Sequence, residues 1–168
     1  MVKDNSEKKK DHGTFIFMPE EAIKSLRSEL SNLLGEKLGS GVLFRFGYRC
    51  GEALMERTQS NNFKGKDMDK VLPRIWEQTG LGKIVSVEEI SEEEVEIVQK
   101  ESAEAKALGK TEKPSCDLTR GYLAGIASML SNKKFYCLET DCISEGKDTC
   151  KFQLLMFPHK VYVPKKGS

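Results

Sequence analysis

Three cysteines and one glutamate in the C-terminal half have the types and spacing of a metal site. Cys142 and Cys150 flank a stretch of turn composition, with seven residues between them, and Glu139 lies three positions before Cys142. Cys116 stands at the expected start of a helix, where free amide groups and the helix dipole favour a thiolate. Three thiolates and one carboxylate suit a four-coordinate Zn²⁺ with no open position. The residues therefore predict a structural zinc site made of Cys116, Glu139, Cys142 and Cys150.

Other roles of the cysteines remain open at this point. Two cysteines opposite each other on a hairpin can form a disulfide, and single cysteines are often small buried hydrophobes. The chain has five cysteines, an odd number, and we expect a reducing compartment, which favours thiols or metal ligands. Cys137 lies two residues before Glu139 on the same face of a strand and is the main rival as fourth ligand. Cys50, beside Gly51, is expected to pack in the core.

The elements that must hold these residues follow from the hydrophobic periodicity. A helix is expected at 116–131, capped by Ser115, and a β-hairpin at 134–140 and 149–157. The other expected elements are a short strand at 14–18, helices at 19–35, 42–58 and 68–78, a hairpin at 83–90 and 94–100, and a short helix or connection at 101–113. This order predicts an α+β fold with an antiparallel or mixed sheet and helices packed on one face.

Two of the expected helices carry the same pattern, Gly-Tyr-x-x-Gly, at 47–51 and 121–125. Glycine inside a helix costs about 1 kcal/mol relative to alanine. A close approach to another backbone, or to a ligand, must offset that cost. We therefore expect close helix packing at both patterns.

Length and charge set the broad class. The 168 residues suffice for one domain with a sizeable core, and 27 basic against 26 acidic residues give a net charge of +1. Such a balance offers no field that would attract nucleic acid or anionic lipid, and no apolar stretch is long enough to span a membrane. We expect a polar, flexible tail at 1–12 and a single domain at 13–168, in a protein that stays in the cytoplasm.

The sequence from Cys116 to Gly125, Cys-Asp-Leu-Thr-Arg-Gly-Tyr-Leu-Ala-Gly, followed by Glu139-x-x-Cys142 and Cys150, resembles the 4-vinyl reductase domain family. The specific match covers 116–152, and 42–54 gives weaker support. That family includes archaeal proteins described as predicted hydrocarbon binders, phenol-sensing domains of bacterial regulators and a protein of bacteriochlorophyll synthesis. Its ligand-binding fold is shared with nitric-oxide signalling domains and with subunits of the TRAPP vesicle-tethering complex.

The resemblance implies a zinc-containing module that binds or senses a hydrocarbon or aromatic small molecule, and it implies a homodimer. In the phenol sensors the same spacing of three cysteines and a glutamate holds zinc, which implies the same four ligands here. The family places the ligand between helices and sheet. The residues of this chain expected there are Phe44, Tyr48, Trp76 and Tyr122.

Two other functions remain open. One is an accessory or catalytic subunit for the reduction of a tetrapyrrole vinyl group, and the other is a protein-assembly module like the trafficking subunits. The sequence itself assembles no catalytic site. Its two histidines, His12 and His159, accompany no nucleophile motif, and the chain has neither a Walker-type phosphate loop nor a dinucleotide fingerprint.

Overall fold

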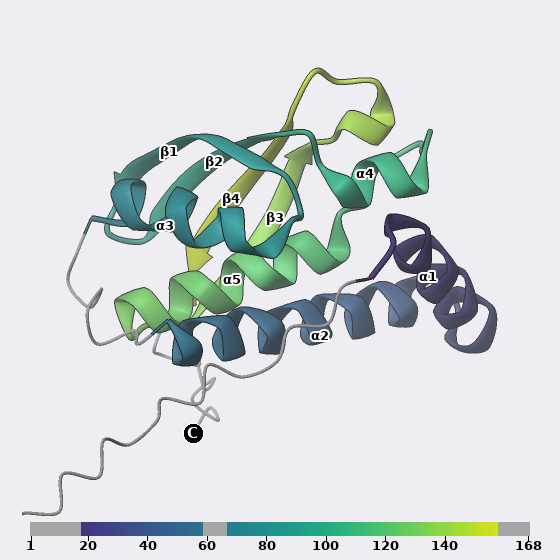
Figure 1. Cartoon of the computed structure of the whole chain (residues 1–168), viewed down its shortest axis with the longest axis horizontal. Coiled ribbons are helices and arrows are strands. Elements are labelled where there is room, and N and C mark those ends of the chain that lie inside the picture. Colours follow the sequence, from purple (N-terminus) through teal and green to yellow (C-terminus); the bar gives the residue numbers. More distant parts are fainter. Residues whose placement is uncertain (1–17, 59–66, 158–168) are drawn as a thin grey trace, which may run out of the picture.

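The computed structural model describes residues 18–58 and 67–157, and helices and strands make up most of these ranges (Figure 1). The expected tail and most of the expected strand at 14–18 lie outside them. The α-helices are α1 (Glu20–Leu34), α2 (Glu36–Arg57), α3 (Met68–Trp76), α4 (Ala103–Leu108) and α5 (Asp117–Ser131). Short 3-10 turns are η2 (Glu77–Thr79) and η3 (Ile143–Glu145), and the strands are β1 (Lys83–Ser91), β2 (Glu94–Lys100), β3 (Phe135–Asp141) and β4 (Cys150–Met156).

The four strands form one antiparallel sheet in the order β1-β2-β4-β3. Both predicted hairpins are therefore confirmed, and strand β2 joins them by pairing with β4. The side chains of Val95, Ile97 and Gln99 are buried on one face of β2, as their alternation predicts. Together with the helices, this sheet confirms the α+β class.

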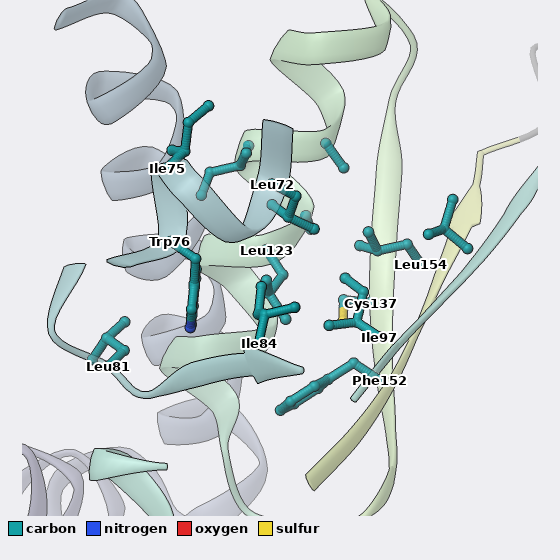
Figure 2. Close-up of a cluster of buried hydrophobic side chains, with 14 of the residues drawn as sticks. Leu72, Ile75, Trp76, Leu81, Ile84, Ile97, Leu123, Cys137, Phe152 and Leu154 are labelled. Atoms are coloured by element: carbon teal, nitrogen blue, oxygen red, sulfur yellow. The ribbon is translucent and has the colours of Figure 1, made fainter. Parts of the chain in front are cut away.

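The helices cover one face of the sheet in two layers. Helix α5 packs against β3 and β4, helix α3 packs against β1, and α2 lies along the side of α5 that faces away from the sheet (Figure 1). The core between α3, α5 and the sheet is apolar, and Leu72, Trp76, Leu123, Ile97 and Phe152 are fully buried in it (Figure 2). Burial of each such side chain contributes roughly 1.5–3 kcal/mol to folding. None of the described helices is long and apolar enough to cross a membrane.

The two Gly-Tyr-x-x-Gly patterns pack against each other. A Cβ atom at Gly47 would collide with the carbonyl oxygen of Leu118, and one at Gly121 would collide with the carbonyl oxygen of Phe44. Gly51 and Gly125 are equally close to the backbone of the opposite helix. The expected close helix packing is thus confirmed, and each pattern is the partner of the other.

Helix α2 starts six residues earlier than predicted. The prediction that glycines end the helical structure between 35 and 41 is wrong except at Gly35, whose φ of 79° separates α1 from α2. Gly39 lies inside α2, where a Cβ atom would be 3.1 Å from the backbone of Leu30. Close contact between α1 and α2 therefore offsets the low helix propensity of this glycine.

The segment before α5 also differs from the prediction. Residues 103–108 form helix α4, whose N-cap is Ser102, with the Ser102 hydroxyl accepting the N–H of Ala105. Ser115 does not cap α5, because the N-cap is Cys116 and the Ser115 hydroxyl donates instead to the carbonyl of Lys113. These local contacts bring the α4 segment against the start of α5.

Candidate metal centre

Four short segments place the predicted ligands at one point. Cys116 is the N-cap of α5, Glu139 lies near the end of β3, Cys142 follows that strand, and Cys150 begins β4. The β3–β4 register shifts between Glu139 and Asp141, an irregularity of the bulge type that redirects the end of a strand. Strand β3 therefore turns toward the start of α5 at the position where the ligands lie.

The sulfur atoms form a nearly equilateral triangle. Cys116 Sγ is 3.7 Å from Cys142 Sγ and 4.0 Å from Cys150 Sγ, and the last two are 3.9 Å apart. Tetrahedral coordination with metal–sulfur bonds of about 2.3 Å gives sulfur–sulfur distances of about 3.8 Å. A disulfide would need about 2.05 Å, and all of these cysteines are free. The geometry fits a metal site and not a disulfide.

Glu139 completes the group. One donor atom from each of the four side chains lies within 4.8 Å of the others. Glu139 Oε2 accepts the backbone N–H of Cys116 at 2.8 Å, whereas Oε1 is buried and has no hydrogen-bond partner among the described residues. A buried acceptor without a partner costs about 1–3 kcal/mol, and a metal ion would satisfy it. Burial raises the pKa of the Glu139 carboxyl to about 8, so a nearby cation would be needed to keep it ionised at neutral pH.

The three thiols share charge unequally when no cation is bound. Hydrogen bonds from the Cys116 and Cys150 thiols hold the pKa of Cys142 far below its usual value. Donation to Cys142 and Cys150, together with burial, raises the pKa of Cys116. One thiolate is thus stabilised by two protonated neighbours. Metal binding would instead need all three sulfurs deprotonated and would release protons.

Each sulfur also has a polar neighbour outside the group. Such neighbours stabilise thiolates and orient metal ligands. The contacts are Ser102 Oγ with Cys116 Sγ at 3.6 Å, Ser144 Oγ with Cys142 Sγ at 2.9 Å, and the N–H of Ile143 with Cys150 Sγ at 3.4 Å.

The remaining cysteines lie apart from this group. Cys137 is buried in the core, and its Sγ contacts the carbonyl oxygen of Leu138 at 3.7 Å (Figure 2). It is not part of the group of donor atoms that the described residues bring together. Cys50 is half-buried on α2, and burial raises the pKa of its thiol.

Glu104 supports the start of α5 and was missed by sequence reasoning. Its carboxylate is fully buried and accepts the N–H groups of Leu118 at 3.0 Å and Thr119 at 2.8 Å. Burial raises the pKa of Glu104 to about 7, although the two hydrogen bonds act in the opposite direction. The residue lies in a charged, alanine-rich stretch, and nothing in that composition distinguishes it from a surface glutamate.

The four aromatic residues predicted for a ligand pocket occupy different surroundings. Trp76 is fully buried, and its ring packs edge-on against Tyr122 with centroids 5.8 Å apart (Figure 2 shows Trp76 in the core). Phe44, Tyr48 and Tyr122 are partly buried against the core. Trp76 Nε1 is buried without a hydrogen-bond partner among the described residues. The structure therefore brings Trp76 and Tyr122 together and leaves a donor in this region unsatisfied.

Two surface clefts lie near the metal ligands. The larger, of about 500 Å³, opens beside Glu139 and is lined mainly by charged side chains. Its lining residues are Arg27, Glu36, Lys37, Ser40, Lys113, Pro114, Asp117, Arg120 and Glu139. A smaller cleft of about 280 Å³ lies between α4 and η3. The four predicted aromatic residues line neither of these clefts.

Family models match both halves of the chain. Residues 95–155, which contain all four candidate ligands, match the 4-vinyl reductase domain. Residues 6–91, just over half of the chain, match the family described as activator of aromatic catabolism.

Two relatives align with most of the chain. An uncharacterized protein of Methanocaldococcus jannaschii is 29% identical over 67% of this chain and 65% of its own length. The transcriptional regulatory protein XylR of Pseudomonas putida is 24% identical over 80% of this chain and 26% of its own length. The chain thus spans less than two thirds of either relative.

Solved structures share the fold at low sequence identity. The phenol-responsive sensory domain of the transcription activator PoxR, solved with phenol, has a TM-score of 0.71 at 22% identity, covering 84% of this chain and 76% of that one. A vinyl-4-reductase family protein from M. jannaschii has a TM-score of 0.60 at 21% identity, covering 86% and 84%.

The wider kinship of the fold is confirmed as well. Subunit 3 of the trafficking protein particle complex from Naegleria fowleri, covalently bound to palmitic acid, has a TM-score of 0.61 at 17% identity, covering 82% and 94%. An H-NOX protein from S. oneidensis has a TM-score of 0.58 at 14% identity, covering 86% and 81%. The chain therefore belongs to the family described as activator of aromatic catabolism, and its C-terminal part is a 4-vinyl reductase domain.

Proposed function

We propose that the chain is a zinc-containing module that binds or senses a hydrocarbon or aromatic small molecule. The observation that carries the metal part is the triangle of three free sulfurs, 3.7–4.0 Å apart, beside the unpartnered Oε1 atom of Glu139. Family membership supports the sensing part, because related proteins include a phenol-responsive domain.

Cys116, Glu139, Cys142 and Cys150 would hold the zinc. The three cysteines are fully buried, so the site suits a closed, structural metal. Zinc there would join the start of α5 to the ends of β3 and β4, and its binding free energy would add to the stability of this corner of the fold. Hydrogen bonds from Ser102, Ser144 and the N–H of Ile143 would hold the thiolates in place.

The small molecule would bind near Trp76 and Tyr122, with Phe44 and Tyr48 as further lining. Trp76 offers a buried indole N–H without a partner in the described ranges, beside an apolar core. Such a donor suits the hydroxyl group of a phenol-like ligand, and the surrounding rings suit its aromatic part. Entry of the ligand would require the rings of Trp76 and Tyr122, now in edge-on contact, to separate.

A second copy of the chain is the proposed protein partner. Leu38, Val42 and Phe46 recur at every fourth position of α2, and their side chains are 64%, 42% and 50% exposed. An apolar stripe of this kind on a helix is unusual for a surface that stays in water. The stripe supports a homodimer in which α2 packs against the partner. It would serve equally in a protein-assembly module, the second candidate function.

Native mass spectrometry of the purified chain tests this proposal. The expected spectrum shows a dimer that carries one zinc per chain and gains mass on addition of phenol or toluene. A dimer or hetero-complex that takes up neither probe would favour the assembly function. The substitution Trp76→Phe, which removes the indole N–H donor and keeps an aromatic ring, is expected to weaken phenol binding more than toluene binding.

A further inference from the structure

The residue that follows Cys116 is held between two arginines from different helices. Arg27 Nη1 on α1 donates to Asp117 Oδ2 at 2.6 Å, and Arg120 Nη2 on α5 donates to Asp117 Oδ1. The side chains of Asp117, Arg27 and Arg120 are only 5%, 16% and 22% exposed. Within the described ranges neither arginine has a second carboxylate at ion-pair distance. Two largely buried cations therefore share one carboxylate, which leaves one positive charge in excess.

The same two arginines also reach the backbone on both sides of the metal group. Arg27 Nη1 donates to the carbonyl oxygen of Ser115 at 2.9 Å, one residue before Cys116. Arg120 Nη1 donates to the carbonyl oxygen of Cys137 at 3.4 Å, two residues before Glu139 on β3. The two guanidinium groups thus connect α1, the start of α5 and β3, and two of these segments carry predicted ligands.

Electrostatics gives the arginines a second role. A divalent cation with three thiolates and one carboxylate carries two surplus negative charges. A buried anionic centre is costly unless positive charge lies close to it. Arg27 and Arg120 line the cleft that also exposes Glu139, so their excess charge faces the ligand group at its least buried member.

We propose that Arg27 and Arg120, joined through Asp117, are positioning residues of the metal centre. They fix the segments that carry Cys116 and Glu139 and supply counter-charge to the loaded site, so they set its affinity for the metal. This inference rests on the proposed zinc site. It adds to the ligand set a charged clamp that ties α1 to the metal group.

The test is a Co²⁺ and Zn²⁺ titration of the full chain in competition with a chromophoric chelator. Arg120→Gln and Arg27→Gln are each expected to weaken metal affinity about 10- to 100-fold, as changes in the surroundings of metal ligands do. Arg120→Lys keeps the charge and is expected to recover a large part of that loss. Arg49→Gln is the matched control, because Arg49 pairs with Glu52 on α2 and its side chain is 76% exposed.

The outcomes separate this inference from the zinc proposal. If the unmutated chain binds neither metal, the zinc proposal fails. If it binds metal and the two glutamine variants bind as tightly, the clamp is overturned. Equal losses in Arg120→Lys and Arg120→Gln would overturn the counter-charge. Thermal unfolding of each metal-free variant shows whether it folds, and Arg27→Gln, which leaves the Asp117–Arg120 pair intact, gives the answer if Arg120→Gln does not.

Discussion

The backbone N–H of Cys116 donates to Oε2 of Glu139 at 2.8 Å, which joins the cap of α5 to the end of β3. This hydrogen bond uses one carboxylate oxygen and leaves the other, Oε1, buried beside the sulfur group without a partner among the described residues. The carboxylate thus has a structural bond and a free ligand atom at once. Glu139 is therefore suited to bind a metal through one oxygen only.

Glu139→Gln separates these two roles. The amide oxygen can still accept the N–H of Cys116, but the negative charge at the site is lost. We expect zinc affinity to fall by more than the roughly tenfold that changes around a metal site cost. Chelator competition measures the affinity. An unchanged value would mean that Glu139 is not a ligand, and Cys137 would then be the residue to test.

Gly121→Ala tests the packing of α2 on α5. A Cβ atom would meet the backbone of Phe44, which cannot move without shifting α2, so a loss of at least about 1–3 kcal/mol in the free energy of unfolding is expected. Gly41→Ala on the same helix pair is the control. Nothing lies within 4 Å of its Cβ position, and the change should stabilise the helix by up to about 1 kcal/mol. Urea denaturation distinguishes the two.

Glu104 predicts a pH dependence of stability. Its pKa is raised by burial from 4.5 to about 7, so the folded chain binds a proton that the unfolded chain releases between these values. The corresponding stability is present below pH 4.5 and is lost as the pH rises through about 7, with a magnitude of ~3 kcal/mol. Urea denaturation of the chelator-treated chain across this range should show the decline, and Glu104→Gln should remove that part of it. An identical pH profile in the variant would contradict the assignment.

Phe46→Glu tests the apolar stripe on α2. A charge at the centre of a dimer interface should weaken self-association by about tenfold or more, since it would lie buried without a partner. Analytical ultracentrifugation measures the change. Leu138→Glu is a matched control, because Leu138 is 42% exposed on β3, outside the stripe. A dimer that survives Phe46→Glu and dissociates with Leu138→Glu would place the interface on the sheet instead.

The sequence predicted the ligand group because its members lie close to secondary-structure boundaries. Spacing alone brings Cys142 and Cys150 to the base of one hairpin, and a helix start is a usual place for a thiolate such as Cys116. The fold class and both hairpins followed from the alternation of apolar residues. The four donor atoms lie together as predicted, whereas the metal and the aromatic pocket stay predictions.

The parts that were not predicted depend on contacts between distant segments. Glu104 and Ser102 act through helix α4, and neither residue type marks a six-residue helix that folds against α5. The early start of α2 depends on Gly39 meeting α1, which no local pattern indicates. Asp117 and Arg27 are 90 residues apart, so their ion pair could not be inferred from either neighbourhood.

Elemental analysis of the purified chain tests the metal site most directly. We expect one zinc per chain in the unmutated protein and in Cys50→Ser, whose thiol lies on α2 outside the ligand group. Cys142→Ser and Cys150→Ser should lose most of the zinc and should unfold at a lower temperature. Metal-free wild-type protein, or equal zinc in all four proteins, would contradict the site.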